Sequence, residues 1–150
     1  MSRKPYVPPR WFIVLAWYTH RGLYRVTGGR VGLGHPKDRN HWGTMRLTTV
    51  GRRTGQQRSV MLGYFEDGPN LVTLAMNGWG EGEPAWWLNL QAQPEVTVRL
   101  KGSSRAVHGR AAVGEERVRL WDRWREIDTD LDGFAARRSS ETAVVVLEPR

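Results

Sequence analysis

Apolar and polar residues alternate in several short runs between residues 45 and 147, and this period of two predicts a protein built mainly of β-strands. Turn-forming sequences such as DGPN at residues 67–70 separate the runs. The expected strands span residues 45–50, 58–66, 71–76, 96–100, 105–113 and 142–147. A basic loop joins the first strand to the second, and a tight turn joins the second to the third. These three strands should therefore form an antiparallel meander.

Three other segments have apolar residues at helical spacing. The expected helices span residues 9–26, 85–92 and 115–127, and the middle one begins after Pro84 and ends before Pro94. The stretch NGWGEGEP at 77–84 contains three glycines and should form no regular structure. Strands with helices inserted late in their order indicate a small antiparallel barrel of the α+β class.

Chain length and composition predict one globular domain. The 150 residues include 39% hydrophobic residues and eight tryptophans, which is enough apolar surface for a real core. The absence of cysteine excludes disulfides, thiolate metal sites and cysteine nucleophiles, and it fits a cytoplasmic protein. The apolar run 11–17 is too short to span a membrane, and no cleavage site follows it.

Net charge is +8, from 23 basic against 15 acidic residues, so the protein should attract anions. The basic residues are dispersed along the chain, which argues against a nucleic-acid partner. In the amphipathic helix expected within residues 1–30, Trp and Tyr alternate with Arg10, Arg21 and Arg25. This mixture suits the anionic inner face of the cell membrane, where the protein would be peripheral; packing of the helix on the barrel is the equal alternative.

Two motifs indicate the chemistry. The loop GRRTGQQR at 51–58 contains three arginines that can bind a phosphate. The Trp-rich segment 84–98 can form the apolar side of a site for a flat aromatic ring. Other candidates are weaker: the spacing of His35, Asp38 and His41 fits no metal site, and no serine lies in a nucleophile elbow. We therefore expect a phosphorylated aromatic cofactor and no metal.

The order of several motifs resembles the deazaflavin-dependent nitroreductase family of actinobacteria. The motifs are GRRTGQQR (51–58), FEDG (65–68), AMNGW (75–79), PAWWLNLQAQPEVTV (84–98), EERVRLW (115–121) and VVVLEP (144–149). The resemblance implies a split β-barrel, here spanning residues 42–150. It also implies hydride transfer from reduced coenzyme F420, a deazaflavin with a phospholactyl and oligoglutamate tail, to quinones, nitro compounds or activated alkenes such as enones.

The resemblance also implies where the cofactor binds. Its phosphate and tail would meet Arg52, Arg53, Thr54, Gln56 and Arg58. Its ring would lie near Val60, Met61 and Leu62, near the turn formed by Ala75, Met76, Asn77 and Gly78, and near the helix carrying Ala85, Trp86, Trp87 and Asn89. The family often has lysine where Asn77 stands. No catalytic residue is assigned, because the cofactor performs the chemistry.

The expected acceptor pocket contains Trp79, Phe134, Arg137 and Arg138. Relatives that reduce nitroimidazoles carry several tyrosines in this C-terminal stretch, whereas residues 131–149 here contain none. Quinones or enones are therefore the expected acceptors. Alternatives are an FMN-binding reductase or oxidase on the same barrel, a non-catalytic cofactor-binding protein, and a basic nucleic-acid module.

Overall fold

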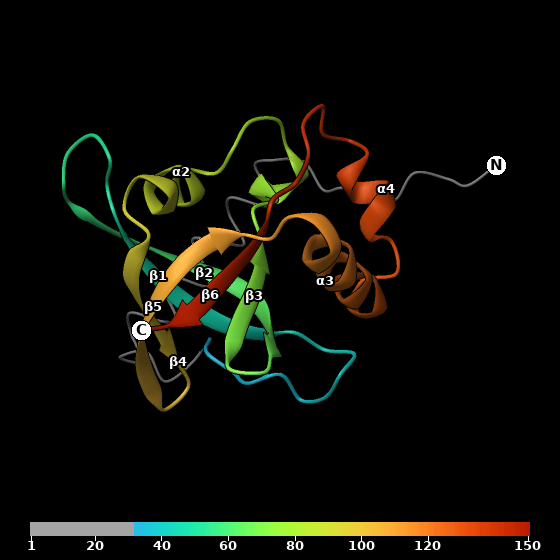
Figure 1. Cartoon of the computed structure of the whole chain (residues 1–150), viewed down its shortest axis with the longest axis horizontal. Helices are drawn as coiled ribbons and strands as arrows, with labels where there is room; N and C mark the ends of the chain where they lie inside the picture. Colours follow the sequence, from blue (N-terminus) through green and yellow to red (C-terminus); the bar gives the residue numbers. More distant parts are fainter. Residues whose placement is uncertain (1–31) are drawn as a thin grey trace.

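The computed structural model describes residues 32–150, in which six antiparallel strands close into a barrel in the order β1-β2-β3-β6-β5-β4 (Figure 1). The strands are β1 (Gly43–Val50), β2 (Gln57–Asp67), β3 (Asn70–Leu74), β4 (Glu95–Leu100), β5 (Ser103–Ala111) and β6 (Val144–Pro149). The helical elements are the 3₁₀ turn η1 (Asn77–Trp79) and the helices α2 (Ala85–Ala92), α3 (Gly114–Ile127) and α4 (Leu131–Ala135). The α+β barrel class is confirmed, whereas the expected helix 9–26 lies outside the described residues.

Each expected strand is present, but several ends differ. Strand β3 stops at Leu74, two residues early, and β6 runs from Val144 to Pro149 rather than from 142 to 147. Strand β5 already begins at Ser103, because the left-handed Gly102 (φ 80°) completes a tight turn after Lys101. Helix α4 was not predicted, since its five residues are too few for a periodic signal.

The interior core fills the barrel and is closed at one end by α2. Alternate residues of the strands point inward, which β1 shows as a strict alternation of buried and half-buried positions. Trp86, Trp87 and Leu90 of α2 complete this core. A Cβ at Gly109 of β5 would lie 2.5 Å from Leu90 Cδ2, so glycine is needed there for the helix to seat. The position of α2, which borders the arginine loop, is therefore set by close packing.

A second core lies outside the barrel, between β2, β3 and β6 and the helices α3 and α4. Phe65 of β2 meets Trp124 of α3 edge to face, with ring centroids 5.1 Å apart. Leu131 at the start of α4 is buried in the same cluster. This outer core holds the C-terminal segment against the barrel. The folded body also begins before residue 42, because Leu33 is buried and Gly34 forms a bridge with Thr44.

Candidate functional site

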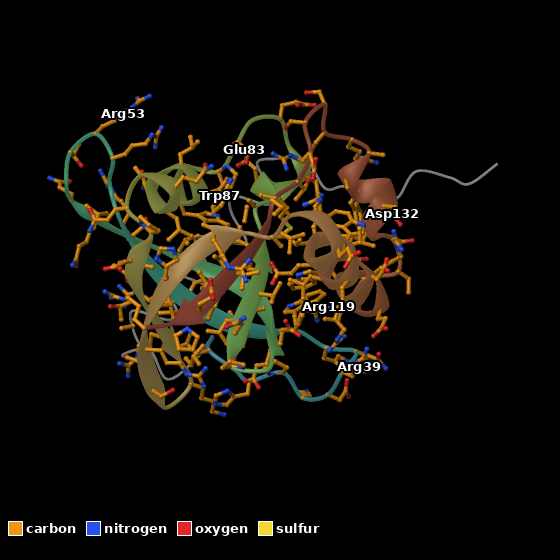
Figure 2. All side chains as sticks on the ribbon, in the orientation of Figure 1. Arg39, Arg53, Glu83, Trp87, Arg119 and Asp132 are labelled. Carbon is orange, nitrogen blue, oxygen red and sulfur yellow. The ribbon has the colours of Figure 1, made fainter. Side chains whose placement is uncertain are left out.

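The arginine loop projects from the hairpin between β1 and β2. Two backbone bonds close its base, from Gly51 N to Gln56 O (2.7 Å) and from Gly55 N to Gly51 O (2.8 Å). Thr54 Oγ1 accepts a bond from Gln56 N, so this hydroxyl already shapes the loop. Figure 2 shows Arg53 at the tip, where it points away from the barrel. The loop is thus locally ordered, and its basic side chains remain exposed.

Asn89 of α2 holds the base of this loop. Its Oδ1 accepts bonds from both the backbone N and the guanidinium Nη1 of Arg52, each at 3.1 Å. Its Nδ2 donates to Thr49 Oγ1 at 3.4 Å, and Asn89 itself is only 4% exposed. Arg58 is the cross-strand partner of Thr49, so its side chain leaves the strand on that same face. Arg52 and Arg58 therefore both approach the side of the loop that faces α2.

The loop has no acidic counter-charge of its own. The sequence has no Asp or Glu from residue 39 to residue 65. Within residues 32–150, the guanidinium groups of Arg53 and Arg58 form no hydrogen bond or ion pair. Exposed guanidinium donors without a protein acceptor can give charge-assisted bonds to phosphate or carboxylate oxygens. The donor set fits the phosphate and acidic tail of a deazaflavin cofactor.

Strand β2 carries the expected ring-binding residues away from the loop. Residues 59–63 are all half-buried, and Val60 and Leu62 pack with one side against the interior core. Met61 follows on the opposite face of the strand. This part of the barrel therefore offers partly exposed apolar surface.

The tryptophans of α2 are placed differently from the expectation. Trp86 and Trp87 are only 9% and 5% exposed, and their rings meet edge to face at 6.3 Å inside the core. Packing of the barrel end buries most of both indoles, so both side chains belong to the interior core, whereas Ala85 on the same helix is exposed.

The turn after β3 is left-handed. Asn77, Gly78 and Trp79 have φ of 51°, 60° and 61°, a conformation that costs about 1–2 kcal/mol for each residue other than glycine. Asn77 Nδ2 donates to the carbonyl oxygens of Glu81 (2.9 Å) and Gly82 (3.2 Å). The side-chain amide of Asn77 therefore stabilises its own turn, and Met76 beside it is exposed.

Two of the expected acceptor-pocket residues come together. The rings of Trp79 and Phe134 are stacked, with centroids 5.8 Å apart and an interplanar angle of 14°. Phe134 lies on α4, so the stack joins the turn after β3 to the C-terminal segment. Both rings remain half-buried, which leaves apolar surface for a flat acceptor. Arg137, on the same segment, is exposed and has a contact partner of its own.

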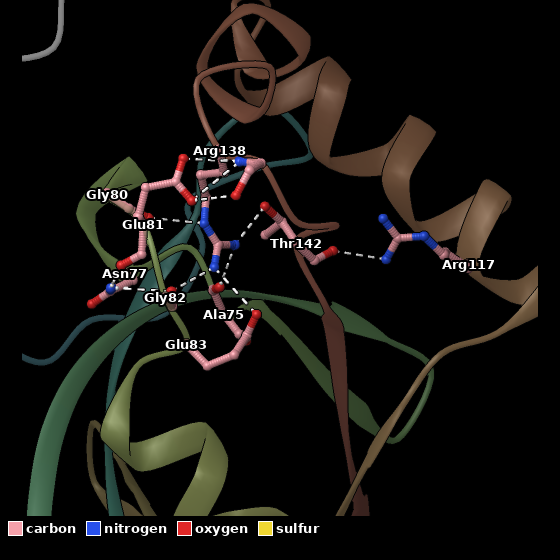
Figure 3. A network of polar contacts seen from close by, with 10 residues as sticks. Ala75, Asn77, Gly80, Glu81, Gly82, Glu83, Arg117, Arg138 and Thr142 are labelled. Carbon is pink, nitrogen blue, oxygen red and sulfur yellow. Dashed lines mark hydrogen bonds and ion pairs between the residues drawn. The ribbon is translucent and has the colours of Figure 1, made fainter.

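Arg138 has a different role from the one expected. Its side chain is 0% exposed, and its guanidinium donates to five acceptors (Figure 3). These are Gly80 O (3.0 Å), Ala75 O (3.1 Å), Thr142 Oγ1 (2.8 Å), Gly82 O (2.7 Å) and Glu83 Oε1 (3.3 Å). A guanidinium has five N–H donors, so none is left for an acceptor molecule. The assignment of Arg138 to the substrate pocket is wrong: it is a structural residue beneath the left-handed turn that follows β3.

A neighbouring contact between the same two segments is also absent from the sequence-based expectations. Glu81 accepts bonds from Ser139 N (2.9 Å) and Ser139 Oγ (2.7 Å), which lowers the pKa of the Glu81 carboxyl. These partners are 58 residues apart, and no local pattern marks such a contact.

In the loop at residues 35–41, the carboxylate of Asp38 pairs with His41 Nδ1 at 2.8 Å. No three metal-ligating side chains gather anywhere in residues 32–150.

Comparisons with known proteins show the family of this chain. Residues 17–149 match the family described as F420H(2)-dependent quinone reductase. An F420H(2)-dependent quinone reductase of Mycobacterium tuberculosis is 29% identical over 134 residues, which cover 87% of this chain and 88% of the relative. The solved structure of an F420-H2-dependent reductase, FDR-A, is 25% identical with a TM-score of 0.64, covering 77% of this chain and 99% of that one.

A further solved structure, described as a domain-swapped dimer, has a TM-score of 0.67 at 24% identity and supports the fold; it covers 91% of this chain and 98% of the other. The fold and the family match define a split barrel of the oxidoreductase class that uses a deazaflavin. The chain belongs to the F420H(2)-dependent quinone reductase family, and its cofactor is coenzyme F420. The family match confirms the resemblance inferred from the sequence motifs.

Proposed function

We propose that this F420H2-dependent oxidoreductase reduces a quinone, with the arginine loop as the anchor for its cofactor. The observation that carries the proposal is the acid-free loop, in which the guanidinium groups of Arg53 and Arg58 have no partner among residues 32–150 and Arg52 is held by Asn89. Bound reduced F420 supplies the hydride that the acceptor receives. The loop would hold the phosphate and acidic tail, and thereby fix the position of the ring along β2.

The apolar side chains of β2 and the turn after β3 would orient the ring. Val60, Met61 and Leu62 offer half-buried surface at the level where the ring would lie if its tail enters the loop. Ala75, Met76, Asn77 and Gly78 would border it from the other side. These residues would bind the ring and exclude water, and they would not react themselves. The rate of hydride transfer should therefore depend on their geometry.

The stacked pair Trp79 and Phe134 would line the acceptor side. An apolar surface without hydroxyl groups favours quinones and enones, whereas nitro compounds that need hydrogen-bond donors should be poorer acceptors. Arg137, exposed on the same segment, would lie where it can meet a carbonyl oxygen of the acceptor.

Titration of the purified protein with F420 and with FMN tests the cofactor assignment, since both are fluorescent and both could use a phosphate grip. We expect quenching and saturable binding for F420 and much weaker binding for FMN. Oxidation of F420H2, followed by absorbance, should then depend on an added quinone. Tighter binding of FMN, or binding of F420 without quinone-dependent turnover, would support the FMN enzyme or the non-catalytic binder instead.

We also propose that the N-terminal segment brings the enzyme to anionic membrane surfaces, where lipid-soluble quinones dissolve. The support is its sequence, in which aromatic residues alternate with Arg10, Arg21 and Arg25. No helix within residues 32–150 is long and apolar enough to cross a bilayer. The protein should float with vesicles rich in anionic lipid at low salt and be released by high salt. Recovery in the soluble fraction at low salt would overturn this proposal.

A further inference from the structure

Arg138 lies at the junction of two segments that are distant in sequence. On one side is the loop 75–83, which follows β3 and contains the left-handed turn; on the other is the segment 131–142, which follows α3. Three of the five acceptors of Arg138 are backbone carbonyl groups of that loop, at Ala75, Gly80 and Gly82. The guanidinium thus binds the backbone on both sides of the turn, at Ala75 before it and at Gly80 and Gly82 after it (Figure 3).

The turn needs such a support. Asn77 and Trp79 both adopt positive φ, which L-residues with side chains disfavour, and such a conformation persists only where the surroundings determine it. Within the turn, only the amide of Asn77 and the backbone bonds of Trp79 and Gly80 act locally. The guanidinium adds three bonds to the same backbone, of which the bond to Ala75 O is buried and those to Gly80 O and Gly82 O are partly buried.

Two more contacts connect the same segments. Glu81 binds the backbone and hydroxyl of Ser139, and Trp79 stacks on Phe134. Both lie at the surface of the junction, whereas Arg138 occupies its interior. The three interactions together make the turn and the C-terminal segment one unit.

We propose that Arg138 is a positioning residue for cofactor binding: it holds the turn 76–79 in the left-handed conformation that receives the deazaflavin. This inference rests on the proposed function for the place of the cofactor. It assigns to a buried arginine a role in affinity without any contact with the cofactor. Shape rather than charge is the requirement, because a planar guanidinium reaches five acceptors at once and an ammonium group has only three donors.

The first experiment measures F420 binding by fluorescence titration of Arg138→Met, Arg138→Lys and Thr142→Val, well below their melting temperatures. We expect the dissociation constant to rise on the order of tenfold for Arg138→Met, somewhat less for Arg138→Lys, and least for Thr142→Val, which removes one acceptor of five. Arg119→Met is the matched control, since Arg119 forms a two-bond ion pair with Asp67 away from the loop. Its affinity should stay that of the native protein.

The second experiment follows hydrogen exchange in the cofactor-free proteins. The amides of Trp79 and Gly80 donate within the turn, to Met76 O and Asn77 O, and should exchange faster in Arg138→Met while β1 remains protected. This readout tests the turn even if F420 is not the cofactor. Should Arg138→Met not fold, Arg138→Lys and Thr142→Val carry both measurements.

Three results would overturn the inference. Native exchange at Trp79 and Gly80 in Arg138→Lys and Thr142→Val would show that the guanidinium does not hold the turn. Faster exchange with native F420 affinity would show that the turn does not determine binding. Native affinity in Arg138→Lys would show that charge alone suffices. Failure of the native protein to bind F420 would instead contradict the proposed function.

Discussion

The arginine loop and the buried Arg138 are both basic, yet they use their donors in opposite ways. In the loop, Arg53 and Arg58 are exposed and have no partner within residues 32–150, and Arg52 has the single side-chain acceptor Asn89. At Arg138 all five donors are bonded to the protein, and the side chain has no exposed surface. One region can therefore bind an anion, whereas the other can only build structure.

Burial explains this difference. A guanidinium taken out of water must replace all of its lost hydrogen bonds. Arg138 is stable in the interior because three carbonyl groups, a hydroxyl and a carboxylate accept its five N–H bonds. An exposed arginine is already solvated and can exchange water for a ligand oxygen. The number of arginines near a site thus says little about binding until the burial of each is known.

The largest effect should come from removing the buried cation. Arg138→Met leaves three carbonyl groups, one buried and two partly buried, and the partly exposed Glu83 carboxylate without their donors, so the free energy of unfolding should fall by about 3 kcal/mol. Arg119→Met, which breaks an exposed ion pair, should lower it by no more than about 1 kcal/mol. Urea denaturation of both variants measures the difference. Equal losses would mean that burial does not distinguish the two arginines.

Loop arginines should affect binding rather than stability. Replacing Arg52, Arg53 or Arg58 by Ala should weaken F420 binding by about 1.5–3 kcal/mol, as a lost charge-assisted hydrogen bond. The free energy of unfolding should change by less than about 0.5 kcal/mol for Arg53→Ala and Arg58→Ala. Fluorescence titration and denaturation give the two values. Lys101→Ala removes the same charge from the β4–β5 turn, and an equal loss of affinity there would reduce the effect to net charge.

The acceptor side should respond more weakly. Phe134→Tyr adds a hydroxyl to the ring that stacks on Trp79, and a single new hydrogen bond is worth roughly 2- to 10-fold in rate. We expect the native enzyme to prefer quinones or enones over bicyclic nitroimidazoles, and the variant to recover part of the nitroimidazole activity. Steady-state kcat/KM for both acceptor classes checks this. Equal turnover of both classes by the native enzyme would show that the missing tyrosines do not select the acceptor.

Acidification should have the smallest effect, and it should act on the outer layer. The guanidinium of Arg119 lowers the pKa of Asp67 by hydrogen bonding, and that of Arg110 lowers the pKa of Glu116. A carboxyl with a lowered folded-state pKa stabilises the fold above its unfolded value, 3.8 for Asp67, and loses this as pH falls. Since the pair is partly exposed, its contribution should stay below about 1 kcal/mol. The midpoint of urea denaturation should therefore fall slightly less between pH 5 and pH 3 in Asp67→Asn than in the native protein. An equal fall in both proteins would assign the acid sensitivity to other carboxyl groups.

Much of the fold could be predicted from local patterns. The six strands and the helices α2 and α3 follow from alternation, helical spacing and turn residues, because each depends on neighbours in the sequence. The loop of Arg52, Arg53 and Arg58 was found for the same reason, since its glycines and arginines are contiguous. Errors were confined to strand ends and to short elements such as α4, where one or two tertiary contacts decide the boundary.

Only the tertiary structure decided which of these side chains are available to a ligand. Trp86 and Trp87 look like ring walls in the sequence, but closure of the barrel places both in its core. Arg138 looks like its neighbour Arg137, but the left-handed turn near residue 78 surrounds it with acceptors from more than 50 positions away. Spacing along the chain determines the elements, and the order of the motifs carries the resemblance that implies the cofactor, whereas burial depends on contacts between distant segments that no local pattern encodes.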